Sequence, residues 1–148
     1  MKQLIDNLIQ IYKAAVVAGR ITLNSVRKGI HNDPALIPLG EYPYIAFDDG
    51  GQKVEDVNSN TAQRRIFTVL IEIGVYALDL ESALDLILDT IDACKAELES
   101  ESNRSLLYDS HVWAISMTPF AWGPENQFFR GVQIACNFLE LEPKFNDY

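Results

Sequence analysis

The stretch RRIFTVLIEIGVYALDLESALDLILDTIDACKAEL, Arg64–Leu98, decides the fold because its hydrophobic period changes partway along. From Arg65 to Tyr76, apolar residues crowd both faces and β-branched residues are frequent, which predicts a central strand covered on at least one side. After Asp79, an excellent N-cap, an apolar stripe recurs at helical spacing between acidic residues. Its members are Leu80, Leu84, Ile87, Leu88, Ile91, Cys94 and Leu98. A strand passing directly into an amphipathic helix predicts a β–α core unit.

Composition indicates one globular domain. The chain has 148 residues, of which 48% are hydrophobic and 22% charged. Its net charge of −9 argues against tight wrapping of nucleic acid, because such affinity comes from Lys and Arg neutralising phosphates. Polar residues interrupt the N-terminal apolar run, so neither a signal peptide nor a membrane span is expected. Cys94 and Cys136 lie at apolar positions and are expected to be buried free thiols of a cytosolic protein.

The N-terminal third predicts one helix followed by less regular chain. Lys2 to about Ala18 has an apolar face wide enough to be buried on more than one side, in the domain or against a neighbouring subunit. Ile21–Ile30 fits neither period and is expected to form an extended or irregular arm. Asn32–Pro43 contains three prolines and Gly40, so it is expected to be a loop or linker.

The middle of the chain predicts the first hairpin. Tyr42–Phe47 has the pattern of a short strand that ends at the turn signal Asp48–Gly51. Gln52–Gln63 is polar and too long for a tight turn, which predicts an exposed functional loop or a disordered excursion. The strand Arg65–Tyr76 is expected to pair antiparallel with Tyr44–Phe47 across this loop.

The C-terminal third predicts a second hairpin, with strands at His111–Phe120 and Phe128–Leu141 and a connection at Pro119–Asn126. The expected fold is therefore α+β: an N-terminal helix, then two β-hairpins forming a mostly antiparallel four-stranded sheet packed by a central amphipathic helix. The expected single domain, 1–148, has a helix and arm (1–31), a linker (32–43), a sheet–helix core (44–141) and a frayed tail (142–148).

The sequence offers little catalytic chemistry. His111 follows Asp109 and Ser110, but neighbouring strand residues point to opposite faces and cannot converge on one substrate atom. His31 lies near Asp33 without the spacing of a metal site. No phosphate loop or dinucleotide motif is present. We therefore expect no catalytic residue, no cofactor and no metal, and a protein that is not an enzyme.

Two residue groups are candidates for a subunit or partner interface. Arg64 and Arg65 open the central strand and are candidates for holding carboxylates of a partner, or else form a charged strand entrance. The second group crowds the C-terminal hairpin turn, either as an interface or as a core lid packed by the first helix. It consists of Phe120, Trp122, Phe128 and Phe129.

The order and texture of these segments resemble a known family. A first helix is followed by YPYIAF, a polar loop, the decisive stretch quoted above, VWAISMTPFAW and FFRGVQIACNFLEL. Over roughly residues 40–141 this is similar to the tail terminator (tail completion) proteins of long-tailed bacteriophages. The most telling local feature is the strand Ile66–Tyr76 passing into the helix that begins near Asp79.

The resemblance implies a structural virion protein in the phage tail, assembled in the host cytoplasm. Such proteins form a hexameric ring that caps the head-proximal end of the tail tube, stops its polymerisation and forms the head-joining surface. The implied partners are further copies of the chain, the tail tube protein and head–tail connector proteins, with DNA passing through the channel without sequence-specific binding and without a membrane. The alternatives are another head–tail connector, adaptor or stopper protein and, from a different class, a small-ligand-binding or enzymatic α+β domain.

Overall fold

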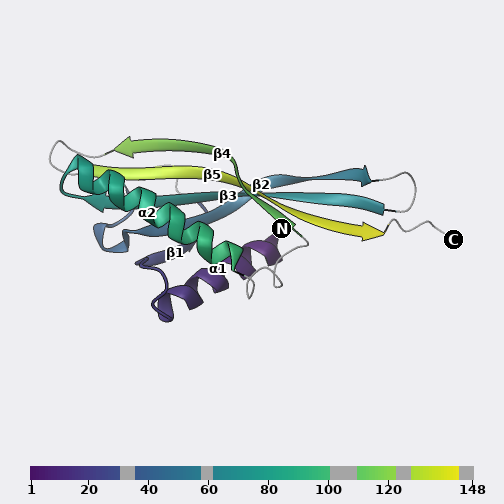
Figure 1. Cartoon of the computed structure of the whole chain (residues 1–148), viewed down its shortest axis with the longest axis horizontal. Coiled ribbons are helices and arrows are strands. Elements are labelled where there is room, and N and C mark those ends of the chain that lie inside the picture. Colours follow the sequence, from purple (N-terminus) through teal and green to yellow (C-terminus); the bar gives the residue numbers. More distant parts are fainter. Residues whose placement is uncertain (31–35, 58–61, 101–109, 123–127, 144–148) are drawn as a thin grey trace.

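A computed structural model describes residues 1–30, 36–57, 62–100, 110–122 and 128–143. The protein is α+β, with two α-helices and a five-stranded mixed sheet (Figure 1). In chain order the elements are α1 (Lys2–Val17), β1 (Ser25–Lys28), the 3-10 helix η2 (Leu39–Glu41), β2 (Tyr44–Val57), β3 (Ala62–Ala77), α2 (Leu80–Glu99), β4 (Ser110–Trp122) and β5 (Phe128–Pro143).

The sheet has the strand order β1-β2-β3-β5-β4. The predicted antiparallel pairing of the first hairpin is confirmed, with Tyr44 opposite Gly74 and Phe47 opposite Ile71. The predicted count of four strands is wrong because the expected irregular arm contains β1, which pairs parallel to β2 over four residues. A strand of four residues is too short to show a hydrophobic period in the sequence. Its position in the sheet depends instead on where the chain meets the sheet after α1.

The predicted polar loop at Gln52–Gln63 is also wrong for most of its length. Strand β2 continues to Val57 and β3 begins at Ala62, so the two form a long ladder. The expected turn at Asp48–Gly51 is instead an irregularity within β2, where the register shifts between Asp49 and Gln52 and Gly51 adopts φ +102°. Beyond it, β2, β3 and β5 extend past the helices as an arm (Figure 1).

Both helices pack on one face of the sheet. α1 contacts β1 and β2, whereas α2 contacts β3 and β5, and both contribute to one hydrophobic core. Alternate residues of the strands face this core, among them Val69, Ile71 and Ile134, none of which is exposed. The opposite face of the sheet, called here the open face, is covered by no α-helix among the described residues.

The second hairpin is confirmed, with β4 antiparallel to β5 at the end of the sheet. Ala121 and Trp122, expected in the connection alone, belong to β4, as do Pro119 and Phe120, where the predicted strand and connection overlap. An end strand accommodates Pro119 because one side of its backbone needs no ladder partner. Four alternate residues of β5 are buried in the core: Val132, Ile134, Cys136 and Phe138.

Several predicted features lie outside the described residues: His31, Asp33, Asp109 and most of the expected tail, 142–148. The described part of the expected linker contains η2. Both cysteines are free and buried, as predicted. Among the described residues, no helix is long and apolar enough to cross a membrane.

Candidate assembly surfaces

Helix α2 presents apolar residues on two flanks, and the sheet covers only one. The helix begins as predicted: the Asp79 side chain, at the N-cap, accepts a hydrogen bond from the Ser82 N–H at 2.8 Å.

The predicted apolar stripe of α2 is only half correct. Ile87, Cys94 and Leu98 are buried, but three leucines remain about half exposed: Leu80 at 50%, Leu84 at 44% and Leu88 at 51%. These three, called here the leucine row, recur at intervals of four and so lie along one side of the helix.

The leucine row points away from α1. The opposite flank of α2 faces α1 and the chain after it, because Arg20 binds Glu97 there and Leu86 and Thr90 border the same hollow as Ile21. Leu84 and Leu86 are two residues apart, which separates them by about 160° around the helix. Since α2 lies over β3 and β5, the leucine row faces the side of β4.

Strand β4 adds apolar side chains beside this row. Met117 is 44% exposed and stands opposite Ile134, a core residue, so it projects on the helix side of the sheet. Ile115, 50% exposed, lies in the irregular stretch where the register with β5 shifts and Ala114 adopts φ 56°. The leucine row and Met117 are therefore exposed apolar residues on the same side of the sheet, and a contiguous patch of such residues is the kind of surface that marks interaction sites.

The two predicted arginines lie on the arm but do not form one patch. Arg64 donates to Glu55 at 2.7 Å, and Lys53 contacts the other oxygen of the same carboxylate at 2.7 Å. These bonds, from Lys53 first and then Arg64, lower the pKa of Glu55. Arg65 is the next residue of the strand and projects from the opposite face, across from Val54. Arg64 is thus engaged within its own chain.

The predicted aromatic residues separate into two faces. Trp122 stacks on Phe120 and on Phe129, with ring centroids 5.0 and 5.4 Å apart. They lie on the open face with Tyr42, which contacts both Trp122 and Phe129, and not against the first helix. Phe128 alternates to the other side of β5. The cluster is mainly an internal lid over the sheet, since its rings cover one another and Tyr42 is only 5% exposed.

A buried carboxylate lies beside this cluster. Glu72 is 1% exposed, and its two oxygens accept hydrogen bonds from the Tyr44 hydroxyl at 2.8 Å and from the Gln133 amide at 3.1 Å. The Tyr44 ring crosses Gly74, where an added Cβ would lie 2.2 Å from a ring carbon. Burial, followed by the bond to Glu72, raises the pKa of Tyr44 far above its usual value, so the hydroxyl remains a donor. Sequence alternation placed Glu72 on a strand face but gave no sign of this network.

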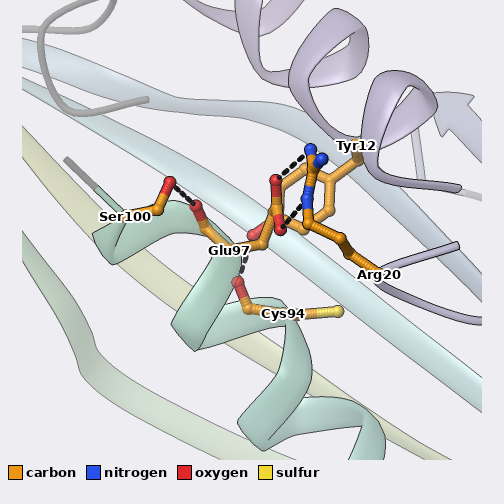
Figure 2. A network of polar contacts seen from close by, with 5 residues as sticks. All are labelled: Tyr12, Arg20, Cys94, Glu97 and Ser100. Atoms are coloured by element: carbon orange, nitrogen blue, oxygen red, sulfur yellow. Dashed lines mark hydrogen bonds and ion pairs between the residues drawn. The ribbon is translucent and has the colours of Figure 1, made fainter. Parts of the chain in front are cut away.

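A second polar network joins α1 to α2 (Figure 2). The Tyr12 hydroxyl donates to the Cys94 carbonyl at 2.5 Å. Arg20 donates through two nitrogens to the two oxygens of Glu97, at 3.0 and 3.2 Å. Glu97 is 8% exposed, so this bidentate pair supplies the charge-assisted bonds that a buried carboxylate needs. The network fixes one helix against the other and brings no reactive group to the surface.

Burial also suppresses the reactivity of the cysteines. It raises the pKa of the Cys94 and Cys136 thiols from 9 to about 12. A thiol reacts as the thiolate, so both remain protonated and inert near neutral pH. Within the described ranges, no group of three or more His, Cys, Asp or Glu residues is arranged to hold a metal ion.

Two surface hollows complete the inventory of candidate sites. One, of about 270 Å³, lies between the chain after α1 and helix α2, where Thr90 donates to the Leu86 carbonyl and Arg20 is held by Glu97. The other, of about 350 Å³, lies at the irregularity of β2 on the open face, bordered by Lys53 and by a hydrogen-bonded Thr68. The side chains named here bond within the chain, so neither hollow offers the convergent polar groups of a ligand site.

No protein-family model matches the chain, and no curated protein is found to be a relative.

Proposed function

We propose that this chain is a structural protein of a phage tail, of the tail terminator kind, that assembles into a ring at the head-proximal end of the tail tube. In this role it ends tube polymerisation and forms the surface that joins the head. The observation that carries the proposal is the exposed leucine row of α2, with Met117 exposed on the same side of the sheet, because exposed apolar residues grouped on a domain that has its own core mark an interaction site. The resemblance of the sequence supplies the identity of the assembly.

The charge of the chain is compatible with a DNA channel. At a net charge of −9, a ring of such subunits repels the phosphate backbone overall and lets DNA pass without being held. The acidic residues of α2 also disfavour two copies meeting through α2 on both sides, since like charges would face each other. A head-to-tail contact, in which two different patches meet, avoids this opposition and closes into a ring when the rotation between neighbouring copies divides a full turn.

The arm gives a first test of the proposal. Reversing both Arg64 and Arg65 to Glu is expected to weaken assembly while the subunit stays folded, because the arm lies beyond the helix-covered core. The matched control replaces both with Lys, which keeps the charge. Normal rings from the Glu variant would contradict a role for these arginines.

The decisive measurement is negative-stain electron microscopy of the protein at low and high concentration, alone and mixed with tail tubes. Rings with a central hole, or caps at one end of the tubes, are the expected result. Binding to isolated connectors with no effect on tubes would instead assign the chain to the connector, adaptor or stopper class. A monomer that ignores both would remove the virion role.

A further inference from the structure

The two helices carry charges of opposite sign: the segment that contains α1 is basic, and the segment that contains α2 is acidic. Residues 1–30 contain five basic residues and one acidic residue, a net charge of +4. Residues 78–99 contain seven acidic residues and one basic residue, a net charge of −6. The first group forms α1 and β1, and the second forms α2. The protein is therefore a charge dipole across its sheet, hidden behind an overall charge of −9.

The two charged regions lie side by side on one face of the sheet. α1 covers β1 and β2, at one edge of the strand order, and α2 lies next to it over β3 and β5 (Figure 1). The leucine row is on the flank of α2 that is turned away from α1. Lys2 and Lys13 lie on the exposed side of α1 with Val17, which is 89% exposed. This side of α1 is opposite the stripe that packs on the sheet.

Carboxylates border the leucine row on its solvent side. Asp85 and Asp92 are both exposed. Asp85 follows Leu84 by one residue and Asp92 follows Leu88 by four, so both lie beside the row on the helix surface. The acidic rim and apolar centre fit a helix face that is basic and partly apolar. The exposed side of α1 carries Lys2, Lys13 and Val17, and its one carboxylate, Asp6, is paired with Lys28 of β1 at 2.8 Å, so the side is basic overall and partly apolar.

We propose that the exposed side of α1 of one copy docks on the leucine row and β4 of the next copy. The occupant is thus a second copy of this chain, in a head-to-tail contact in which Lys2 and Lys13 face Asp85 and Asp92. This inference rests on the proposed ring and names the contact that closes it. Opposite charges select the partner and its orientation, and the buried leucines supply the attraction.

The test is a charge swap between two variants. One variant carries Lys2→Glu and Lys13→Glu, so that its α1 is acidic. The other carries Asp85→Lys and Asp92→Lys, so that its α2 rim is basic. Alone, each variant opposes like charges at every contact and is expected to assemble at least about tenfold more weakly than the original chain in sedimentation experiments at low ionic strength.

Mixing the two variants in equal amounts is expected to restore assembly. In the mixture, the unaltered α2 of the first variant meets the unaltered α1 of the second, and the reversed pair supplies the other contact. Only alternating rings satisfy both contacts, so the restored rings contain an even number of subunits. High salt is expected to weaken assembly of the original chain and of the mixture alike.

The matched control is Lys95→Glu, compared with Lys13→Glu alone, because each changes the charge of the chain by −2. Lys95→Glu adds to the acidic surface of α2 and is expected to leave assembly as strong as before or stronger. A general effect of net charge would instead weaken assembly equally in these two single variants. Thermal melting of every variant verifies the fold.

Three outcomes decide the matter. Restoration by mixing supports the contact. Folded variants that assemble normally, or a mixture that stays dissociated, would overturn the contact while leaving the tail role intact if the original chain still caps tubes. An original chain that remains monomeric and leaves tubes uncapped would overturn both the contact and the proposed function.

Discussion

The protein is expected to unfold cooperatively when the pH rises a little above 10. Five buried groups hold a proton more tightly in the folded protein than in the unfolded chain. They are Tyr12, Tyr42, Tyr44, Cys94 and Cys136, each at most 5% exposed. Burial is the largest cause in every case, and it raises the pKa of Tyr42 from 10 to about 12 and that of each thiol from 9 to about 12.

The direction of the effect follows from proton linkage. The folded pKa values are raised, so the stability they contribute is complete below the unfolded pKa values and is lost as the pH climbs toward the folded ones. Each group costs about 1.4 kcal/mol per pH unit once the unfolded form ionises. The two thiols therefore remove about 3 kcal/mol by pH 10, and with the three tyrosines the loss reaches about 10 kcal/mol by pH 11. Domains are stable by about 5–15 kcal/mol, so any stability up to about 10 kcal/mol is exhausted by pH 11, and the transition of such a domain falls between these pH values.

Far-UV circular dichroism and tyrosinate absorbance, recorded together along a pH titration, measure this transition. The expected result is a sharp rise in tyrosinate that coincides with the loss of ellipticity. Replacing both Cys94 and Cys136 by Ala is expected to remove the loss of stability that begins near pH 9, whatever its effect at neutral pH. Gradual ionisation of all tyrosines with unchanged ellipticity would refute the argument that these hydroxyls are held by burial.

Three further substitutions separate fold from assembly. Gly74→Ala is expected to cost about 1–3 kcal/mol, seen as a lower melting temperature, because the new Cβ displaces the Tyr44 ring. Arg20→Ala is expected to lower stability by leaving the Glu97 carboxylate buried without its bidentate partner, and a double variant that also carries Glu97→Gln is expected to regain part of the loss in denaturant unfolding. Leu84→Ser is expected to change stability by less than about 0.5 kcal/mol yet abolish rings in sedimentation, since this side chain is half exposed in the single chain.

The sequence predicted correctly those elements that have a clear hydrophobic period and a marked boundary. The strand at Arg65–Tyr76 and the helix after Asp79 were correctly placed because each has a clear period and the N-cap marks their boundary. The predicted loop at Gln52–Gln63 failed because none of the described helices covers either face of the arm. A strand exposed on both sides needs no alternation of polar and apolar residues, so its pattern resembles a loop.

The candidate site was harder to predict than the fold. Helical spacing identified Leu80, Leu84 and Leu88 as apolar positions but could not say that α1 and the sheet cover the other flank of α2. The sequence did carry one indication that part of α2 stays uncovered: its apolar stripe is wide enough to extend around the helix to two flanks. The aromatic residues were predicted as either an interface or a lid, and Trp122 and Phe129 form a lid on the face opposite to the one expected.

The edges of the sheet explain why assembly should use helix faces instead of added strands. Edge strands are templates for further pairing, and proteins protect them with prolines, charges, irregularities and short length. Here β1 is only four residues long, and β4 carries Pro119 and a register shift near Ala114. On the arm, the exposed edge of β2 carries the charged Lys53 beyond its own irregularity. Since these edges are protected, the proposed contact uses the exposed leucines and the opposed charges of α1 and α2. Side-chain contacts of this kind close into a ring where the rotation between neighbouring copies allows it, whereas strand addition would continue without limit.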